Sequence, residues 1–214
     1  MLSEKATTVD PGTKRIFHVT HLRNLPGILS AGCIQADARG ALPVVDLSSV
    51  ENRARRRAAA VSSGESVASF VPFFLVPHAE LWAGALAGAA DERLAPAAQK
   101  LPAGEFVMLV STMGQIAKSE LASGGVVLAD DDAAATVARF TVVDGKAVRL
   151  PRLDEGRELV AELLVQDSFP MGSISLVGVA NDKARGQVRE LLRASEFSPK
   201  IAVYPPWFQP VELD

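Results

Sequence analysis

The sequence predicts a mixed α+β domain. Several short runs rich in β-branched and aromatic residues are separated by a few scattered helical patterns, and no internal repeat or regular strand–helix alternation is present. That distribution is typical of an α+β arrangement and not of a βαβ repeat. The 214 residues suffice for one well-filled core. We therefore expect a single domain over residues 14–214, preceded by a polar, Pro- and Gly-punctuated flexible lead-in over residues 1–13.

The first expected strand leads directly into the first expected helix. Residues 15–20 combine β-branched and aromatic side chains and predict a strand. Residues 21–30 predict a helix, with Pro26 near its start and Gly32 as its stop signal. A strand that runs straight into a helix is a common way to build a ligand cradle. The polar residues at this junction are His18, Thr20, His21 and Asn24.

An apolar run over residues 67–76 predicts the next strand after a helix expected at residues 49–61. Pro72 lies inside this run and has no N–H to donate, so we expect the strand at a sheet edge or a bulge. Further expected elements are a helix at residues 79–88 and strands at residues 105–111 and 126–128.

The C-terminal half begins with the acidic run Asp130–Asp132, which we interpret as the N-terminal cap of a helix starting near Ala133. A hairpin around Asp144-Gly145 is expected over residues 140–148. The last expected elements are strands at residues 157–165, 173–179 and 201–204 and an amphipathic helix at residues 182–195.

Glu162 is the acidic residue in an otherwise apolar strand. With a period of two it shares one strand face with Val160 and Leu164. A carboxylate between aliphatic neighbours is costly to desolvate unless it is ion-paired, hydrogen-bonded or facing a cleft. The alternative is an edge strand on which Glu162 points to water. The residue pattern leaves both interpretations open.

Four arginines crowd the helix expected at residues 49–61, namely Arg53, Arg55, Arg56 and Arg57. Consecutive residues do not share a helix face, so some of these side chains must point to solvent. A charge run is usually a solvated surface. Phosphate binding is the alternative, because the guanidinium fork suits it and because the cluster stands out in a chain of net charge −3.

Composition excludes several classes of protein. The net charge gives no global basic field, although a local basic patch is enough for nucleic-acid contacts. Cys33 is the only cysteine, so no internal disulfide can form. The start of the chain has no signal-peptide pattern and no run reaches membrane-spanning length, so we expect a cytoplasmic protein. Without a Gly-rich phosphate loop, GxSxG, HExxH or Cys-His spacing, we expect a site without a metal.

Several segments in a fixed order resemble the DarT family of DNA ADP-ribosyltransferase toxins, the toxin half of the DarT–DarG toxin–antitoxin pair. They are Phe17–Leu29, Gly32, Ser49–Arg53, Phe70–Phe74 and Ala161–Val165. Each segment is weakly specific alone, and their joint order and spacing make the resemblance. It extends from about Arg15 to Phe208 and includes the terminal Trp207-Phe208.

The resemblance implies an ADP-ribosyltransferase fold: a split, mixed β-sheet core with flanking helices that holds NAD in a central cleft. It also implies transfer of ADP-ribose from NAD to a base in single-stranded DNA, typically thymidine. The implied partner is an antitoxin of the DarG type, which carries a macrodomain, reverses the modification and binds the toxin.

The resemblance also assigns roles by position. Glu162 matches the catalytic glutamate, and Arg53 matches the arginine that meets the NAD phosphates or the reacting base. The expected NAD contacts are Thr20, His21, Asn24, Gly32, Arg53 and Phe74. Arg55, Arg56 and Arg57 are expected to meet DNA phosphates.

This chain departs from the family pattern around Pro72. Ser69-Phe70 and Phe73-Phe74 stand where the family often has Asp-Tyr and a second tyrosine, so hydroxyl groups are absent while stacking remains possible. Other targets therefore stay open, namely guanine bases, RNA or protein. A non-catalytic nucleic-acid-binding module is the alternative from outside the enzymes.

Overall fold

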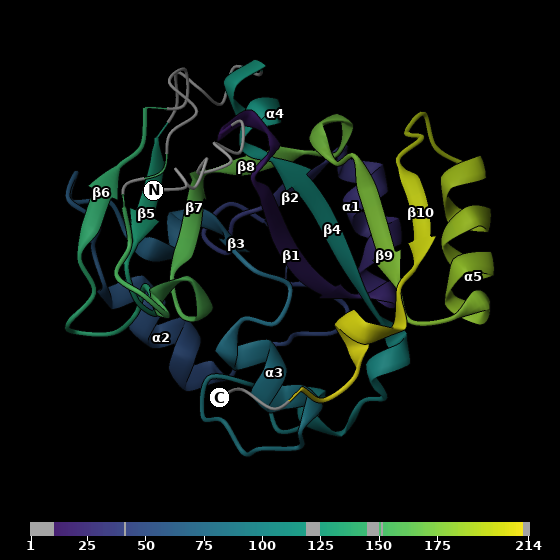
Figure 1. Ribbon diagram of the computed structural model, residues 1–214, viewed down its shortest axis with the longest axis horizontal. Coiled ribbons are helices and arrows are strands. Elements are labelled where there is room, and N and C mark those ends of the chain that lie inside the picture. The colour runs from purple at the N-terminus through teal and green to yellow at the C-terminus, as the bar shows by residue number, and fades with distance from the viewer. Residues whose placement is uncertain (1–10, 41, 119–124, 145–149, 151, 212–214) are drawn as a thin grey trace, which may run out of the picture.

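An eight-stranded mixed sheet runs through the molecule in the order β10-β9-β4-β1-β3-β7-β5-β6, as the computed structural model in Figure 1 shows. The structure describes residues 11–40, 42–118, 125–144, 150 and 152–211. Only the pair β9–β10 is parallel among the described strand pairs. A small second sheet pairs β2 with β8. The expected α+β class is confirmed.

The strands are β1 (Arg15–His21), β2 (Cys33–Gln35), β3 (Phe70–Phe74), β4 (Phe106–Thr112), β5 (Val126–Ala129), β6 (Phe140–Val142), β7 (Glu162–Gln166), β8 (Ser168–Pro170), β9 (Leu176–Val179) and β10 (Lys200–Val203). The helices are α1 (Leu25–Ala31), α2 (Val50–Ala58), α3 (Glu80–Leu86), α4 (Met113–Lys118) and α5 (Asp182–Arg193). In Figure 1, α5 lies beside β10 at one end of the sheet, and α2 lies near β7 in the other half. The sequence did not indicate α4 or the β2–β8 pair.

Both faces of the sheet are buried at its centre, and alternate residues of the central strands serve different cores. On β4, Val107 and Leu109 join the larger core with Leu25 of α1, whereas Met108 packs in a second cluster with Trp82 of α3. This alternation follows from the two-residue period of a strand. The continuous apolar character of β4 is therefore explained by burial on both sides.

The sheet splits between β1 and β3. These neighbours are paired in register only at Phe17 and Phe74, whereas β3 pairs with β7 along its full length. Nδ1 of His18 donates to the Pro72 carbonyl at 2.9 Å, so a side-chain hydrogen bond partly replaces the backbone hydrogen bonds between β1 and β3. In the sheet order β3 lies between β1 and β7, so the expectation that Pro72 lies at a sheet edge is wrong. Its missing N–H is tolerated because the pairing opens there.

The first strand and helix differ from expectation at their junction. His21 ends β1, a 3-10 turn spans Leu22–Asn24, and α1 begins at Leu25. The imidazole Nδ1 of His21 accepts a hydrogen bond from the Arg23 N–H and so caps the turn. Pro26 then stands in the first turn of α1, where a missing N–H costs nothing.

Three expectations about the second half need correction or lie partly outside the described residues. The helix expected after Asp132 does not form. The described residues 131–138 form turns and bends instead, and Asp132 accepts from the Ala134 N–H at 2.8 Å. The strand expected at residues 157–165 begins only at Glu162, after a 3-10 turn at Arg157–Leu159. For the hairpin expected over residues 140–148, β6 pairs with β5, and residues 145–149 lie outside the described part.

The buried His18 predicts a pH dependence of stability. Burial lowers the pKa of its imidazole, and the hydrogen bond to Pro72 offsets this only in part. The folded protein thus holds His18 neutral, while the unfolded chain takes up a proton near pH 6.5. As the pH falls below about 6.5, the free energy of unfolding should therefore fall relative to that of His18→Gln, by up to about 1.4 kcal/mol per pH unit.

Urea unfolding of both proteins between pH 5 and pH 8 measures this difference. A constant gap between wild type and His18→Gln over the whole range would contradict the neutral, buried imidazole.

Candidate functional site

Glu162 begins β7 and is 7% exposed. It lies on one rung of the sheet between Phe74 of β3 and Ala129 of β5, so β7 is an inner strand and not an edge. Nη1 of Arg56 donates to both carboxylate oxygens, at 2.9 Å and 3.3 Å. The Ala133 N–H lies 3.4 Å from Oε1 and completes the shell. The buried carboxylate is therefore held by a cation and a backbone donor.

The helix α2 decides which arginine reaches Glu162. Its N-cap is Ser49, whose hydroxyl accepts from the Asn52 N–H at 3.0 Å. Asn52 is buried, and Arg56, four residues on, lies on the same helix face. The Arg56 side chain is 15% exposed, against 42% for Arg55 and 57% for Arg57. Among these three arginines, Arg56 therefore points inward, and Arg55 and Arg57 point outward.

Arg53 also points inward, toward two aspartates and not toward Glu162. Its Nε donates to Asp46 at 2.6 Å, and its Nη1 contacts Asp37. Burial lowers the pKa of Arg53, with nearby Arg57 adding to the effect, and raises the pKa of Asp46, so desolvation opposes both charges. Among the described residues, no hydrogen bond joins Glu162 to Arg53 or His21. The structure therefore brings Arg56 to the glutamate.

Three buried side-chain atoms of α2 have no hydrogen-bond partner in the described part of the chain. They are Nη2 of Arg56 and Nη1 of Arg53, both donors, and Oδ1 of Asn52, an acceptor. Of these, Nη1 of Arg53 is ion-paired with Asp37. Buried polar groups are normally paired, and an unpaired one costs free energy. Arg56 thus keeps one donor free while its Nη1 holds Glu162. A substrate oxygen is the kind of group that would satisfy it.

The polar residues at the end of β1 are buried and bonded to one another. Asn24 donates to the Thr20 hydroxyl at 3.1 Å and to the Val45 carbonyl at 2.9 Å, and its Oδ1 accepts from the Val45 N–H at 2.8 Å. His21 uses Nδ1 for the Arg23 N–H and places Nε2 3.1 Å from Glu105. This junction therefore fixes the loop that contains Val45 against β1.

His21 and Glu162 stand at separate ends of the candidate site. Phe17 is the β1 residue on the Phe74 rung, which is also the Glu162 rung. His21 lies four residues beyond Phe17 on β1, roughly 13 Å along the strand at about 3.3 Å per residue. A dinucleotide can span such a separation, whereas a single hydrogen bond cannot.

The two other residues expected to contact NAD have clear local roles. Gly32 has φ +71° and ends α1, a left-handed conformation that favours glycine. Phe74 is partly buried against the cluster that contains Phe17 and Trp82, on the same rung as Glu162. Phe74 is thus the aromatic ring in the strand position beside the glutamate.

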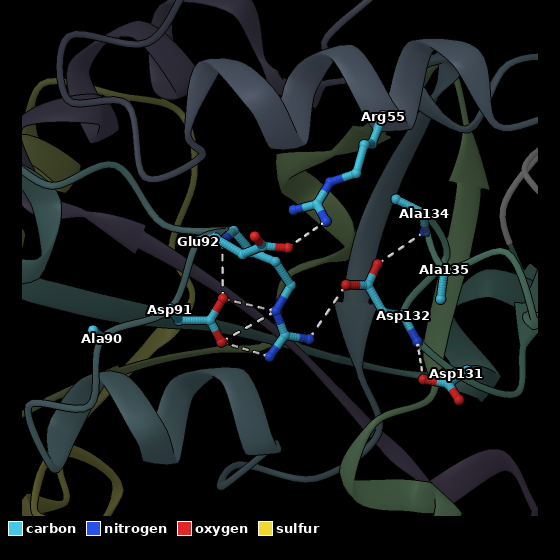
Figure 2. A pocket seen from close by; sticks show the side chains of 9 residues that line it. Arg55, Ala90, Asp91, Glu92, Asp131, Asp132, Ala134 and Ala135 are labelled. Atoms are coloured by element: carbon cyan, nitrogen blue, oxygen red, sulfur yellow. Dashed lines mark hydrogen bonds and ion pairs between the residues drawn. The ribbon is translucent and has the colours of Figure 1, made fainter.

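A cavity of about 420 Å³ lies beside this region and is shown in Figure 2. Its charged lining comprises Arg55, Asp91, Glu92, Arg93, Asp131 and Asp132. Nothing in the local sequence links residues 91–93 to Asp132, for which the acidic run predicts only a helix cap. No group of metal-ligating side chains occurs among the described residues.

The described helices include none that is both long and apolar enough to cross a membrane.

A sheet that splits beside a buried, arginine-held glutamate on an inner strand agrees with the ADP-ribosyltransferase fold that the resemblance implies. The family model described as "ssDNA thymidine ADP-ribosyltransferase, DarT" matches residues 17–209, and the chain belongs to this family. The resemblance inferred from the sequence is thereby confirmed, and with it the enzyme class.

Solved structures agree on the fold. Thermus sp. 2.9 DarT in complex with ADP-ribosylated ssDNA is 23% identical, with a TM-score of 0.72 over 91% of this chain and 95% of that one. The same Thermus protein in complex with NAD⁺ is 22% identical, with a TM-score of 0.69 over 93% and 99%. Thermosipho africanus DarTG in complex with ADP-ribose is 17% identical, with a TM-score of 0.65 over 91% of this chain and 51% of that one. No curated protein matches the chain.

The contacts of Asn24 predict a mainly structural cost for its removal. Asn24→Ala deletes both hydrogen bonds to Val45 and should lower the free energy of unfolding by about 1–3 kcal/mol. Thr20→Val is the matched control, because it removes the hydroxyl that accepts from Asn24 and keeps both bonds to Val45. The decrease in the free energy of unfolding of Thr20→Val, measured by urea unfolding, should be smaller than that of Asn24→Ala. Equal stability of Asn24→Ala and wild type would show that the bonds to Val45 do not hold the loop.

Proposed function

We propose that this protein transfers ADP-ribose from NAD⁺ to a thymidine base in single-stranded DNA, with Glu162 and Arg56 at the reacting centre. Membership of the DarT family supports the reaction. The observation that supports these residues is the buried contact between the two side chains at the start of an inner strand.

The carboxylate of Glu162 suits the bond that breaks. When the bond between C1′ of the ribose and the nicotinamide nitrogen breaks, positive charge develops at the sugar and the electron pair leaves with nicotinamide. A fixed carboxylate nearby stabilises that charge and can orient the ribose hydroxyls. Arg56 and the Ala133 N–H hold the Glu162 carboxylate in place before the substrate arrives. A held carboxylate needs no reorganisation during the reaction.

The guanidinium of Arg56 suits the group that attacks. A base nitrogen forms the new bond to C1′ and releases a proton, which a neighbouring group or water must accept. Negative charge that builds on the base oxygens in this step can be met by Nη2 of Arg56, the donor without a partner in the described chain. Arg56 would thus act on the base and on Glu162 together.

Arg53 keeps a supporting role in this proposal. Its charge is taken up by Asp37 and Asp46, so it ties the segment between them to α2. NAD⁺ would lie between Glu162 and the end of β1, where Thr20, His21 and Asn24 shape the wall and Phe74 offers a ring for stacking. Gly32 would contribute the turn that ends α1.

Single-stranded DNA would be drawn to the outward side of α2. Arg55 and Arg57 are exposed. In the described part of the chain their partners are the exposed Glu92 at 2.6 Å and the partly buried Asp37 at 3.1 Å, which Arg53 also contacts. Exposed ion pairs contribute little, so phosphates can replace these carboxylates. Binding that rests on such contacts weakens steeply as salt rises.

We further propose that the protein is the toxin of a toxin–antitoxin pair and that its partner is a DarG-type antitoxin with a macrodomain. The name DarTG of the Thermosipho structure supports this pairing. The proposed action on DNA and consumption of NAD⁺ support a cytoplasmic location.

The target base can be tested with the purified protein, NAD⁺ and a panel of oligonucleotides read by mass spectrometry. Single-stranded DNA that contains thymidine should gain the mass of one ADP-ribose, and matched strands without thymidine should not. The panel includes guanine-only DNA, duplex DNA, RNA and a cell lysate, since guanine, RNA and protein are the competing targets. Modification of one of these, with none on thymidine, would replace the proposed substrate.

The reacting residues can be tested by removing one charge at a time. Glu162→Gln and Arg56→Gln should each lower the rate of transfer by about 10²- to 10³-fold, because each deletes a charged group at the reacting centre. Arg193→Gln on α5 is the matched control, since it breaks an exposed pair with Glu190. Circular dichroism verifies that each variant is folded.

Arg53→Gln separates the two inward arginines. The variant leaves Asp37 and Asp46 without the cation of Arg53. It should therefore affect the free energy of unfolding more than the transfer rate of the folded protein. If Arg53→Gln abolished transfer while folded and Arg56→Gln kept full activity, Arg53 would be the arginine of the reacting centre.

A further inference from the structure

Arg93 lines the charged cavity of Figure 2 and bridges two of its carboxylates, those of Asp91 and Asp132. It makes three hydrogen bonds to Asp91, from Nε at 2.9 Å and 3.2 Å and from Nη2 at 2.6 Å. Its Nη1 reaches Asp132 at 3.2 Å. Figure 2 shows Asp91 and Asp132 on opposite sides of the cavity. The Asp91 carboxylate raises the pKa of Arg93, and the guanidinium lowers the pKa of Asp91, so both stay charged.

One arm of this bridge leads to Glu162. Asp132 accepts from the Ala134 N–H at 2.8 Å through Oδ1, while its Oδ2 meets Arg93. Ala133 lies between these contacts, is fully buried, and directs its N–H to Glu162. Fixing Asp132 therefore fixes the backbone donor that contacts the carboxylate.

The other arm leads to the helix that carries Arg56. The Ser49 N–H donates to the Arg93 carbonyl at 2.9 Å, and the Ser49 hydroxyl donates to the Glu92 carbonyl at 2.6 Å. Ser49 is the N-cap of α2. Residues 91–93 thus hold the start of α2 and the turn at Asp132 in one unit. The two groups that contact Glu162 come from those two elements.

The cavity itself is poorly suited to a ligand, because its charges are already matched. Arg93 takes Asp91 and Asp132, Arg157 takes Asp131 at 2.6 Å, and Arg55 takes Glu92. The exposed Arg55–Glu92 pair can still exchange with a phosphate, but the buried pairs of Arg93 leave no free charge deeper in this lining. The network is therefore better explained by what it holds in place.

We propose that Arg93 is a positioning residue for the transfer reaction: through Asp132 and the backbone of residues 92–93 it sets Ala133 and α2 around Glu162. The proposal rests on the proposed role of Glu162. Arg93 touches no substrate in this scheme, and its effect passes through the geometry of the carboxylate.

Arg93→Lys is the sharpest variant, because lysine keeps the charge beside Asp91 but lacks the fork that spans both carboxylates. It should lower kcat for transfer by about tenfold to a hundredfold, the scale of a small misplacement at a reacting centre, with KM for NAD⁺ nearly unchanged. Asp132→Asn, which breaks the same bridge from its other side, should show the same split. Arg193→Gln, with an exposed pair of its own, should match wild type.

A double-variant cycle distinguishes positioning from a general loss of structure. If Arg93 acts through Glu162, Arg93→Lys should have no further effect on the residual rate in a Glu162→Gln background. A full multiplicative loss in that background would show that Arg93 acts elsewhere.

Hydrogen exchange provides a readout that needs no activity. In Arg93→Lys the amides of residues 132–134 should exchange faster, while those of β4 and β9 should not change. Unchanged exchange together with an unchanged kcat would overturn the proposal. A wild-type protein without transfer activity would instead refute the proposed function, and the exchange experiment would still decide whether Arg93 holds the Asp132 turn.

Discussion

A carboxylate buried in a sheet constrains everything packed around it. Glu162 lies between two strands with its side chain almost out of water, and a charge in that position must be compensated or its desolvation would oppose folding. The compensation comes from Arg56, on a helix 106 residues earlier in the chain, and from one backbone N–H. A buried pair adds little net stability compared with an apolar pair. Its retention at this place is therefore better explained by chemistry than by folding.

The second constraint is the opening between β1 and β3. A sheet with paired strands throughout would present a closed surface, but here the ladder is interrupted beside Pro72, and His18 bridges the gap with a single side-chain hydrogen bond. Because of this interruption, the end of β1 is not in register with the rung of Glu162. His21 and Asn24 at that end are held by their own hydrogen bonds. The split thus separates the two ends of the proposed site, each of which is held by its own hydrogen bonds.

Local sequence predicted what depends on local physics. The strands around Val107 and Leu163, the helix that carries the arginines, and the need of Glu162 for a partner all follow from apolar periodicity and desolvation. The choice between Arg53 and Arg56 does not, because both face inward and only the long-range packing of α2 decides which one meets Glu162. The inner position of Pro72 and the bridge from Arg93 to Asp132 likewise join residues distant in sequence. Family resemblance supplied the fold and the reaction but not this pairing.

The arginines of this acidic chain divide by burial into two groups with different energetics. Arg55 and Arg57 form exposed pairs whose carboxylates can be exchanged for phosphates at small cost. Arg56 and Arg93 form largely buried pairs, and removing one partner of such a pair leaves a charge that water cannot reach. Substrate binding can therefore rearrange the outer surface of α2 while the inner contacts keep their geometry. In the proposed mechanism a single helix thereby combines an adaptable surface for a charged polymer with a fixed cation at the reacting carboxylate.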